Sequence, residues 1–507
     1  MTPRRFRAAA LGGIVMLAAA PASADTLREA LARAYASNPT LTGQRAALRA
    51  TDENVPIVRA NGLPGVNLTG AFNENAVQAS NAFFNPERSV TGIAQLSVPL
   101  FQGGAVRNGV RAAESRVDAG RANLRGTEAN LFTNVVGSYM NVIRDEAIVG
   151  LNTQNVRVLE TNLNASRDRF QVGDLTRTDV AQSEARLALA RAQLQSAQAQ
   201  LVASRENYLN FVGTPPGVLE EPPVLPNLPA TPDAAVAEAL QSNPQIVAAQ
   251  KVRDASRYDV GVARANRLPR VSAVAQGNYF NYLGSAPSSA TGLTQPNSQR
   301  TATTGLQLTM PLFQGGRPAA QVRQAQALQS QAIENVTAIE RSVIAQARSA
   351  YAIWRSSLEV IASSETAVNA NKLSLEGVRA ENSVGTRTIL DILNAEQELL
   401  NSQVTLVSAR RDAYVAGFAL LAAMGDAEAR DLGLEGGALY DPTLNYRRVR
   451  NRINDWDSDP EPAPIGTSTA NSPAQNSRVV RPLDPLLDTN VDRSPALTTG
   501  AASPNRQ

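Results

Sequence analysis

A six-residue motif, Pro-Leu-Phe-Gln-Gly-Gly, occurs twice in this chain and strongly constrains how the chain folds. Its proline and its two glycines stand at Pro99, Gly103 and Gly104 in the first copy and at Pro311, Gly315 and Gly316 in the second. An alternating apolar and polar run enters each copy, and a long helical pattern leaves it. Proline has no N–H to donate to a strand ladder, and paired glycines permit a tight turn. Each copy therefore predicts a junction where a strand ends and a helix begins.

The repetition extends well beyond this motif. At the same spacing of 212 residues, four further residues recur in the pairs Tyr139 and Tyr351, Gly173 and Gly385, Asp179 and Asp391, and Glu184 and Glu396. Before the motif the spacing is 205, since residues 59–61 and 264–266 both read Arg-Ala-Asn. Repetition at this scale indicates a duplicated structural unit rather than a solenoid with a short period.

Two alternating runs precede the motif in each unit. We predict strands over residues 64–76, 89–100, 269–282 and 300–312, each with apolar or small residues at every second position. Their length of about 10–12 residues is what a tilted strand needs to cross an outer membrane. A soluble hairpin shows the same alternation, so the alternation alone leaves both interpretations open.

Long helical patterns follow each copy of the motif. We predict helices over residues 104–172 and 316–383, and about 68 residues correspond to roughly 100 Å. Turns follow at 173–175 and 384–387, and helices return over 176–212 and 388–424. Apolar heptads along these segments predict coiled-coil packing. The half-length helix before the strands and the returning helix together match the long helix in length, so we expect them to lie end to end against it.

The remaining segments complete the predicted organisation. Residues 1–24 have the pattern of a secretory signal peptide: early arginines, a short apolar run and a small-residue cleavage site. The first repeat covers 25–213, a Pro-rich linker 214–232 and the second repeat 233–430. Residues 436–507 are rich in Pro, Ser, Thr, Asn and Asp, which predicts a disordered tail, with Trp456 as a candidate tether at its start.

Composition excludes several classes of function. The chain has no Cys and no His, which removes thiol nucleophiles, His bases, disulfides and nearly all transition-metal sites. Removing residues 1–24 takes away three Arg, and 48 − 3 = 45 basic residues then balance 45 acidic ones. This balance gives no reason to expect a nucleic-acid partner. We expect no cofactor, no metal and no catalytic residue.

Four membrane strands in one chain demand a shared barrel. The smallest bacterial barrels have eight strands, and an open sheet edge is not tolerated in lipid. A dimer gives 8 strands with little lumen, whereas a trimer gives 12. The fold class expected is therefore an α+β membrane protein with two repeats. Three copies would form a 12-stranded β-barrel continuous with a periplasmic α-helical coiled-coil tunnel.

These features resemble the TolC family of outer-membrane channel-tunnels over about residues 25–430. The resemblance is most specific at the duplicated motif and at the two turns, residues 172–180 and 384–391. It implies a homotrimeric exit duct in the outer membrane of a Gram-negative bacterium, with a large periplasmic portion. It also implies a periplasmic adaptor and an inner-membrane transporter as partners, in type I protein secretion or drug efflux.

The resemblance further implies a lock at the tunnel tip. Arg387 matches an arginine that locks the closed tunnel in the family, and its partners match Thr178 and Asp179. A family tyrosine at the lock falls on Asn382, so this chain departs from the pattern there.

Two acidic positions just beyond the arginine line the tunnel entrance in the family and can bind cations that plug it. The first matches Asp391, whereas the second falls on Asn394, so the acidic ring is halved here. Three Asp391 carboxylates around one constriction should raise their pKa or recruit cations.

Simpler interpretations remain open at this stage. Asp179, Arg387 and Asp391 also fit ordinary polar residues at helix ends, where Asp caps the helix and complements its dipole. The glycine pairs lack the following Lys and Ser or Thr of a phosphate loop. A structural coiled-coil protein that tethers envelope layers is the alternative to a channel, and a hydrolase with two carboxylates is a more distant one.

Overall fold

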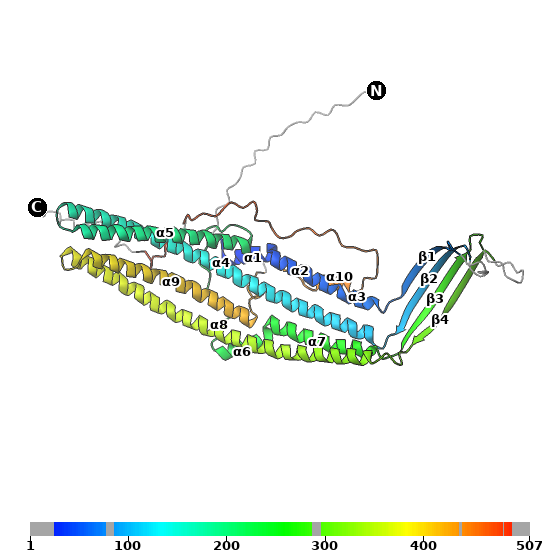
Figure 1. Ribbon diagram of the computed structural model, residues 1–507. Helices are drawn as coiled ribbons and strands as arrows, with labels where there is room; N and C mark the ends of the chain where they lie inside the picture. The colour runs from blue at the N-terminus through cyan, green and yellow to red at the C-terminus, as the bar shows by residue number, and fades with distance from the viewer. Residues whose placement is uncertain (1–24, 78–85, 286–295, 435–438, 480, 489–507) are drawn as a thin grey trace, which may run out of the picture.

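The structure is a computed structural model that describes residues 25–77, 86–285, 296–434, 439–479 and 481–488. The predicted signal peptide, residues 1–24, lies outside the described residues. Figure 1 shows an elongated molecule with helices along most of its length and one sheet at the end. The described elements are α1 (Leu27–Ser37), α2 (Pro39–Asp52), α3 (Asn54–Ala60), β1 (Gly65–Glu74), β2 (Arg88–Phe101), α4 (Ala105–Gln171), α5 (Arg177–Val212), α6 (Pro232–Ser242), α7 (Pro244–Ala265), β3 (Arg270–Asn281), β4 (Ser298–Thr309), α8 (Arg317–Ser383), α9 (Ile389–Met424) and α10 (Leu444–Val449).

The four strands form one antiparallel sheet in the order β1-β2-β3-β4. Its register sets Val66 opposite Leu96, Leu96 opposite Ala275, and Ala275 opposite Thr304. Directly opposed residues in antiparallel strands share a face. All four alternating series predicted from the sequence therefore lie on the same face of the sheet. A slip of one residue in any pair would split this face between the two sides.

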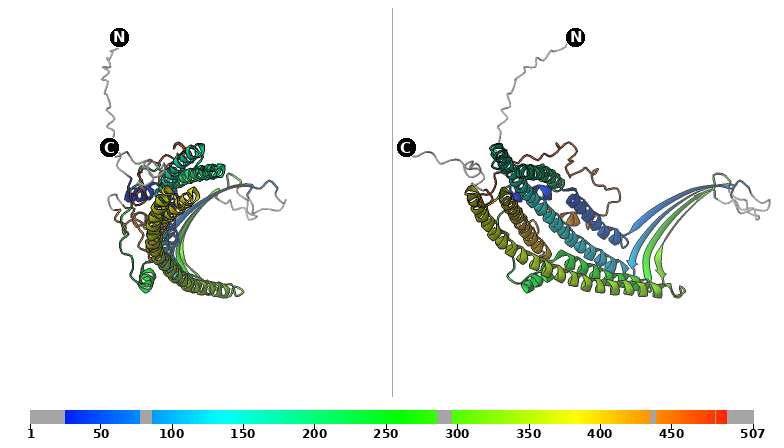
Figure 2. Two further views of the ribbon diagram at one scale, coloured as in Figure 1. Left: turned by 90° about the vertical axis from the view of Figure 1, so that its left-hand side faces the viewer. Right: turned by 60° about the vertical axis from the view of Figure 1, so that its left-hand side comes forward.

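The opposite face carries a matching polar series. One row across the sheet runs from Asn67 through Gln95 and Gln276 to Thr303. The sheet is curved, as Figure 2 shows, and in the described chain β1 and β4 each pair on one side only.

The junctions follow the motif with one correction. Gly103 and Gly315 have φ of +62° and +60°, which side chains rarely adopt, and the glycine after each is also left-handed. Pro99, predicted to end its strand, does not: β2 continues to Phe101, and its register against β3 shifts between Pro99 and Phe101. A bulge accommodates the missing N–H there, whereas β4 ends at Thr309, before Pro311 and short of the predicted residue 312.

The helices form two units that each centre on one long helix (Figure 1). α1, α2 and α3 pack along the N-terminal part of α4, and α5 packs along its C-terminal part. α6, α7 and α9 pack along α8 in the corresponding way. The prediction that two shorter segments lie end to end against each long helix is confirmed. α4 also packs on α7 and α9, which joins the two units within one chain.

Asn-Pro pairs divide the shorter segments. The Asn38 side chain accepts hydrogen bonds from the backbone N–H of Thr40 and Leu41, and Pro39 begins α2. Asn243 and Pro244 repeat this cap at the start of α7. Proline is well tolerated at the first helical position, and Asn is a strong N-cap.

The largest core lies at mid-length, where α1, α4, α5 and α9 meet. Phe132, Tyr139, Tyr208 and Phe418 are fully buried there. The Tyr139 hydroxyl lies 2.7 Å from the carbonyl of Glu220, in the segment that follows α5.

The prediction of a disordered tail from residue 436 differs from the structure over residues 439–479 and 481–488. These residues run back along α2, α1 and α5 (Figure 1). Asn445 donates a 2.9 Å hydrogen bond to Asp52 of α2, and Arg205 of α5 donates to the Asn476 carbonyl at 2.6 Å. Trp456 is not the tether, since it is 95% exposed. Polar side chains and backbone carbonyls hold this segment, so its composition gave no apolar periodicity to detect.

Within the described part of the chain, no helix combines the length and the apolar character needed to cross a membrane.

Candidate gate at the hairpin tips

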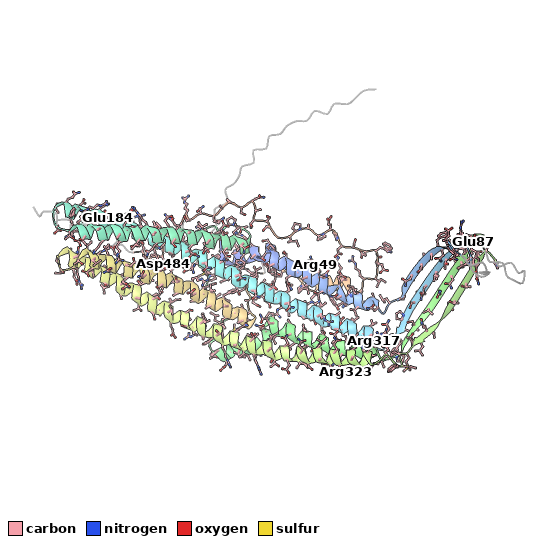
Figure 3. The ribbon with its side chains drawn as sticks, in the orientation of Figure 1. Arg49, Glu87, Glu184, Arg317, Arg323 and Asp484 are labelled. Carbon is pink, nitrogen blue, oxygen red and sulfur yellow. The ribbon has the colours of Figure 1, made fainter. Side chains whose placement is uncertain are left out.

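The candidate gate lies at the end of the molecule farthest from the sheet. There the turn between α4 and α5 and the turn between α8 and α9 close two helical hairpins, which we call hairpin 1 and hairpin 2 (Figure 1). Gly173 and Gly385 have φ of +83° and +84° in these turns, so each supplies the left-handed residue that ends a long helix. Glu184 is labelled near the tip of hairpin 1 in Figure 3.

Each returning helix begins with the same capping box. Thr176 Oγ1 donates to Asp179 Oδ2 at 2.7 Å, and the Asp179 N–H donates back to Thr176 Oγ1 at 3.3 Å. Thr388 and Asp391 repeat this arrangement at 2.8 and 3.4 Å. The Thr-x-x-Asp spacing was present in the sequence as a signal for this motif.

These caps explain the electrostatics of both carboxylates in a single copy. Hydrogen bonds from the Thr176 side chain and backbone lower the pKa of Asp179 from its ordinary value. The backbone N–H of Thr388 and then its side chain lower the pKa of Asp391 in the same way. Within one protomer both carboxylates are therefore stabilised as anions. The raised pKa expected for Asp391 requires other copies of the chain.

Arg387 pairs within its own turn. Its Nε donates to Glu381 Oε2 at 2.8 Å, and both side chains are about half exposed. Asn382 also binds this turn, because its Nδ2 donates to the Arg387 carbonyl at 2.7 Å. Sequence reasoning missed Glu381, although its place six residues before Arg387 across a tight turn favours such a pair.

The structure does not bring the whole predicted lock together in one copy. Within the described protomer, Arg387 bonds to Glu381 rather than to Thr178 or Asp179 of hairpin 1. Thr178 is exposed at the start of α5.

Asn394 and Arg186, a residue not predicted, link the two hairpins. Arg186 of α5 donates to Asn394 Oδ1 of α9 at 2.7 Å. The position where the family has a second acid thus holds an amide that an arginine from the other hairpin binds.

A buried polar cluster lies within the hairpins, a short distance from the tip in the direction of the sheet. Glu396 of α9 pairs with Arg379 of α8 at 2.9 Å, and Asn162 of α4 donates to both Glu396 oxygens at 2.9 and 3.0 Å. All three side chains are almost fully buried. Apolar residues on α4, α5 and α9, Leu159, Leu163, Leu187 and Leu393, form a core in the same part of the hairpins. The cluster therefore fixes how hairpin 2 sits against hairpin 1.

Among the described residues, no group of three or more His, Cys, Asp or Glu side chains is placed to hold a metal ion.

Comparison with known proteins identifies the family. The sequence profile described as "Outer membrane efflux protein" matches residues 30–214 and 235–426. The outer membrane efflux protein BepC of Brucella suis is 34% identical over 87% of this chain and 94% of its own length. The outer membrane protein TolC of Escherichia coli is 26% identical over 88% of this chain and 93% of its own length.

Solved structures share the fold. The CmeC outer membrane channel of Campylobacter jejuni has a TM-score of 0.69, with 16% identity, over 85% of this chain and 90% of that chain. The two repeats of helix, two strands and long helix belong to this common fold. The chain therefore belongs to the outer membrane efflux proteins of the TolC type, and it is a non-enzymatic export channel of the Gram-negative outer membrane with a periplasmic helical tunnel.

Proposed function

We propose that three copies of this chain close a 12-stranded barrel and a continuous helical tunnel. The observation that carries this proposal is the sheet itself, because β1 and β4 have unpaired edges in one copy. An unpaired edge is not tolerated in lipid, and four strands are too few for a barrel. Pairing of β1 with β4 of the next copy removes every edge at once.

The duplicated residues support the same closure. In one copy, a Cβ added to Gly103 would lie 2.8 Å from Cβ of Leu268, whereas Gly315 has nothing within 4 Å. Leu63 is the counterpart of Leu268 in the first repeat. In a ring of six equivalent units, Leu63 of the next copy takes the place beside Gly315.

The ion pairs near the tip show the same difference between equivalent residues of the two repeats. Arg167 and Glu184, 212 residues before Arg379 and Glu396, form a 2.6 Å pair, and both are about half exposed. The buried pair is covered by Asn162 of the first repeat, whose counterpart is Ser374 of α8. We infer that Ser374 of a neighbouring copy covers Glu184. Apolar side chains of α8 left exposed in one copy, such as Ile353 and Leu373, mark the same contact surface.

Cross-linking tests this closure, and the absence of native Cys makes it clean. We expect a Glu184→Cys, Ser374→Cys variant treated with a short bismaleimide to give covalent dimers and trimers on a denaturing gel. Each single variant is the control and should give monomers. Only monomers from the double variant, in protein shown to be folded, would contradict the ring.

We propose that the tips form a gate in this ring, with Arg387 as its lock. In the closed trimer, Arg387 turns from Glu381 of its own turn to Asp179 and Thr178 of a neighbouring hairpin 1. Separation of the hairpins then opens the duct passively. The capping roles of Asp179 and Asp391 are compatible with this, because a capping carboxylate keeps free lone pairs for a second donor.

Two substitutions separate the lock from an ordinary surface pair. We expect Arg387→Ser to raise single-channel conductance in a planar bilayer, whereas Glu381→Gln leaves it unchanged. Equal effects of the two substitutions would assign Arg387 to its own turn only. Unchanged conductance in Arg387→Ser would remove it from the gate.

We propose small toxic compounds as the cargo, delivered through a periplasmic adaptor and an inner-membrane transporter. The support is the 34% identical relative, which is named an efflux protein. Deletion of the gene should lower the resistance of the host to amphiphilic drugs, and the wild-type gene should restore it. A second relative, 27% identical over 72% of its own length, is named an alkaline protease secretion protein. Loss of a secreted protein without loss of resistance would favour that alternative.

A further inference from the structure

The C-terminal residues Arg481–Asp488, which we call the tail strap, lie in a cleft between hairpin 1 and hairpin 2. Asp484, at the centre of the strap, is labelled between the helices in Figure 3. A cavity remains beside the strap, and its walls are the strap itself, Glu221, α4 around Met140–Ala147 and α9 around Val407–Arg411. The strap contains two prolines and folds into a turn after Asp484, whose carbonyl accepts hydrogen bonds from the N–H groups of Leu487 and Asp488 at 2.8 and 3.0 Å.

On hairpin 1, the strap binds α4 at two points. A Cβ added to Gly150 would lie 3.0 Å from Leu483 Cδ2, so the missing side chain of Gly150 is the seat for this leucine. One turn along, Gln154 donates to Asp488 Oδ1 at 3.1 Å.

On hairpin 2, the strap binds both helices. Arg410 of α9 donates to Asp484 Oδ2 at 2.6 Å, and Gln403 of α9 donates to the Leu487 carbonyl at 2.8 Å. Lys372 of α8 donates to the Leu486 carbonyl. Five positions of the eight-residue strap therefore have a specific partner on hairpin 1 or hairpin 2.

An apolar anchor accompanies these polar contacts. Leu487 is 2% exposed and completes a core that contains Leu151 of α4, Val368 of α8 and Leu399 and Val407 of α9. Leu483 and Leu486 pack against the same core. The strap thus adds apolar contacts to a core that both hairpins already share.

The segment just before the strap is held to α5. The buried guanidinium of Arg205 pairs with Glu146 and donates to the carbonyls of Asn476 and Arg478 at 2.6 and 2.9 Å. These bonds keep the start of the strap next to the cleft, which raises its effective concentration there.

We propose that the cleft is a peptide-binding site, that the strap is its occupant, and that the bound strap restrains the two hairpins from separating. The restraining role rests on the proposed gate, whereas the binding does not. Gly150 lies 21 residues before the end of α4, roughly 30 Å from the tip. Hairpins that separate at the tip must rotate about a point that lies farther along the helices, towards the sheet. The strap bridges the two hairpins at this distance from the tip. Their rotation would therefore break the Arg410–Asp484 ion pair and expose Leu487.

Truncation with addition of the free peptide tests the binding. One variant ends after Arg478 and lacks the strap, and the control ends after Asp488 and keeps it. We expect a fluorescent peptide of sequence Arg-Pro-Leu-Asp-Pro-Leu-Leu-Asp to bind the first variant at least about tenfold more tightly than the control, whose cleft is occupied. The same peptide with Leu487→Ala should bind the first variant at least about tenfold more weakly, because its apolar anchor is lost. Equal binding of the peptide to both variants, or none to a strapless variant with a wild-type circular dichroism spectrum, would overturn the site.

Conductance tests the restraint separately. The strapless variant should show more open time than the control, and the added peptide should reverse this. A Gly150→Cys, Leu483→Cys variant provides a second test within one molecule: we expect the oxidised, cross-linked form to open less than the same protein after reduction. Binding without any effect of peptide or reduction on open time would leave the site and refute the restraint. If no variant conducts, including Arg387→Ser, the proposed gate fails while the peptide measurement still decides the site.

Discussion

Removal of Glu396 should weaken the tip far more than removal of its whole ion pair. Glu396→Ala leaves the guanidinium of Arg379, 2% exposed, without this carboxylate, and Asn162 loses the acceptor of its two hydrogen bonds. Breaking a buried pair in this way costs about 3–5 kcal/mol.

The double substitution Arg379→Met, Glu396→Leu removes both charges. Replacing a buried pair by apolar residues of similar size is close to neutral. The Asn162 amide still loses its acceptor, which costs about 1–3 kcal/mol. We therefore expect the double variant to be more stable than the single one by about 2 kcal/mol.

Hydrogen exchange of the tip amides measures this difference. Exchange there reports local opening, and 1.36 kcal/mol corresponds to one factor of ten, so Glu396→Ala should speed exchange about a hundredfold or more around residues 155–166 and 389–399. The double variant should recover at least about tenfold of this protection. A double variant that exchanges as fast as the single one would refute the reasoning, because the cost would then lie in lost packing and not in the loss of the buried carboxylate.

Three further predictions concern other elements. Burial raises the pKa of Glu128 to about 7, although its carboxylate accepts a hydrogen bond from the Ala429 N–H. The folded state should therefore lose stability as pH rises from 4.5 to 7. Glu128→Gln keeps the acceptor and should flatten the pH dependence of the melting temperature between about pH 5 and 8. Thr388→Ala removes the side-chain half of a capping box and should cost about 1 kcal/mol, seen as faster exchange at the start of α9 only. Gly103→Ala puts a side chain at φ +62° and against Leu268, so it should cost at least about 2 kcal/mol and lower the yield of folded protein.

Much of the fold could be predicted from the sequence, because the patterns that specify it are local and occur twice. The alternating series predicted all four strands, and the observed register places all four series on the same face of the sheet. Equal lengths predicted the end-to-end packing of the shorter helices. Pro99 shows the limit of such local rules, since a bulge lets the strand continue past a proline.

The ordered C-terminal segment and the pairing of Arg387 with Glu381 could not be predicted from the sequence, because neither depends on a periodic pattern. Residues 439–479 and 481–488 are held by backbone carbonyls, side-chain amides and single leucines, none of which gives a periodic pattern. The pair Arg387–Glu381 depends on the turn geometry of one hairpin, whereas the lock expected from the family lies between hairpins. The capping boxes were visible in the sequence and account for Asp179 and Asp391 within one copy.

Single-channel conductance with divalent cations on the tip side tests the central claim most directly. Asp391→Asn keeps the oxygen that caps α9 but removes the charge, and Asp179→Asn does the same for α5, so the two variants are matched in fold. We predict discrete openings of the wild-type protein that cations block, with the block relieved in Asp391→Asn and kept in Asp179→Asn. The same block in all three proteins would remove Asp391 from the entrance. The absence of openings in the wild type and in Arg387→Ser would contradict the gated duct.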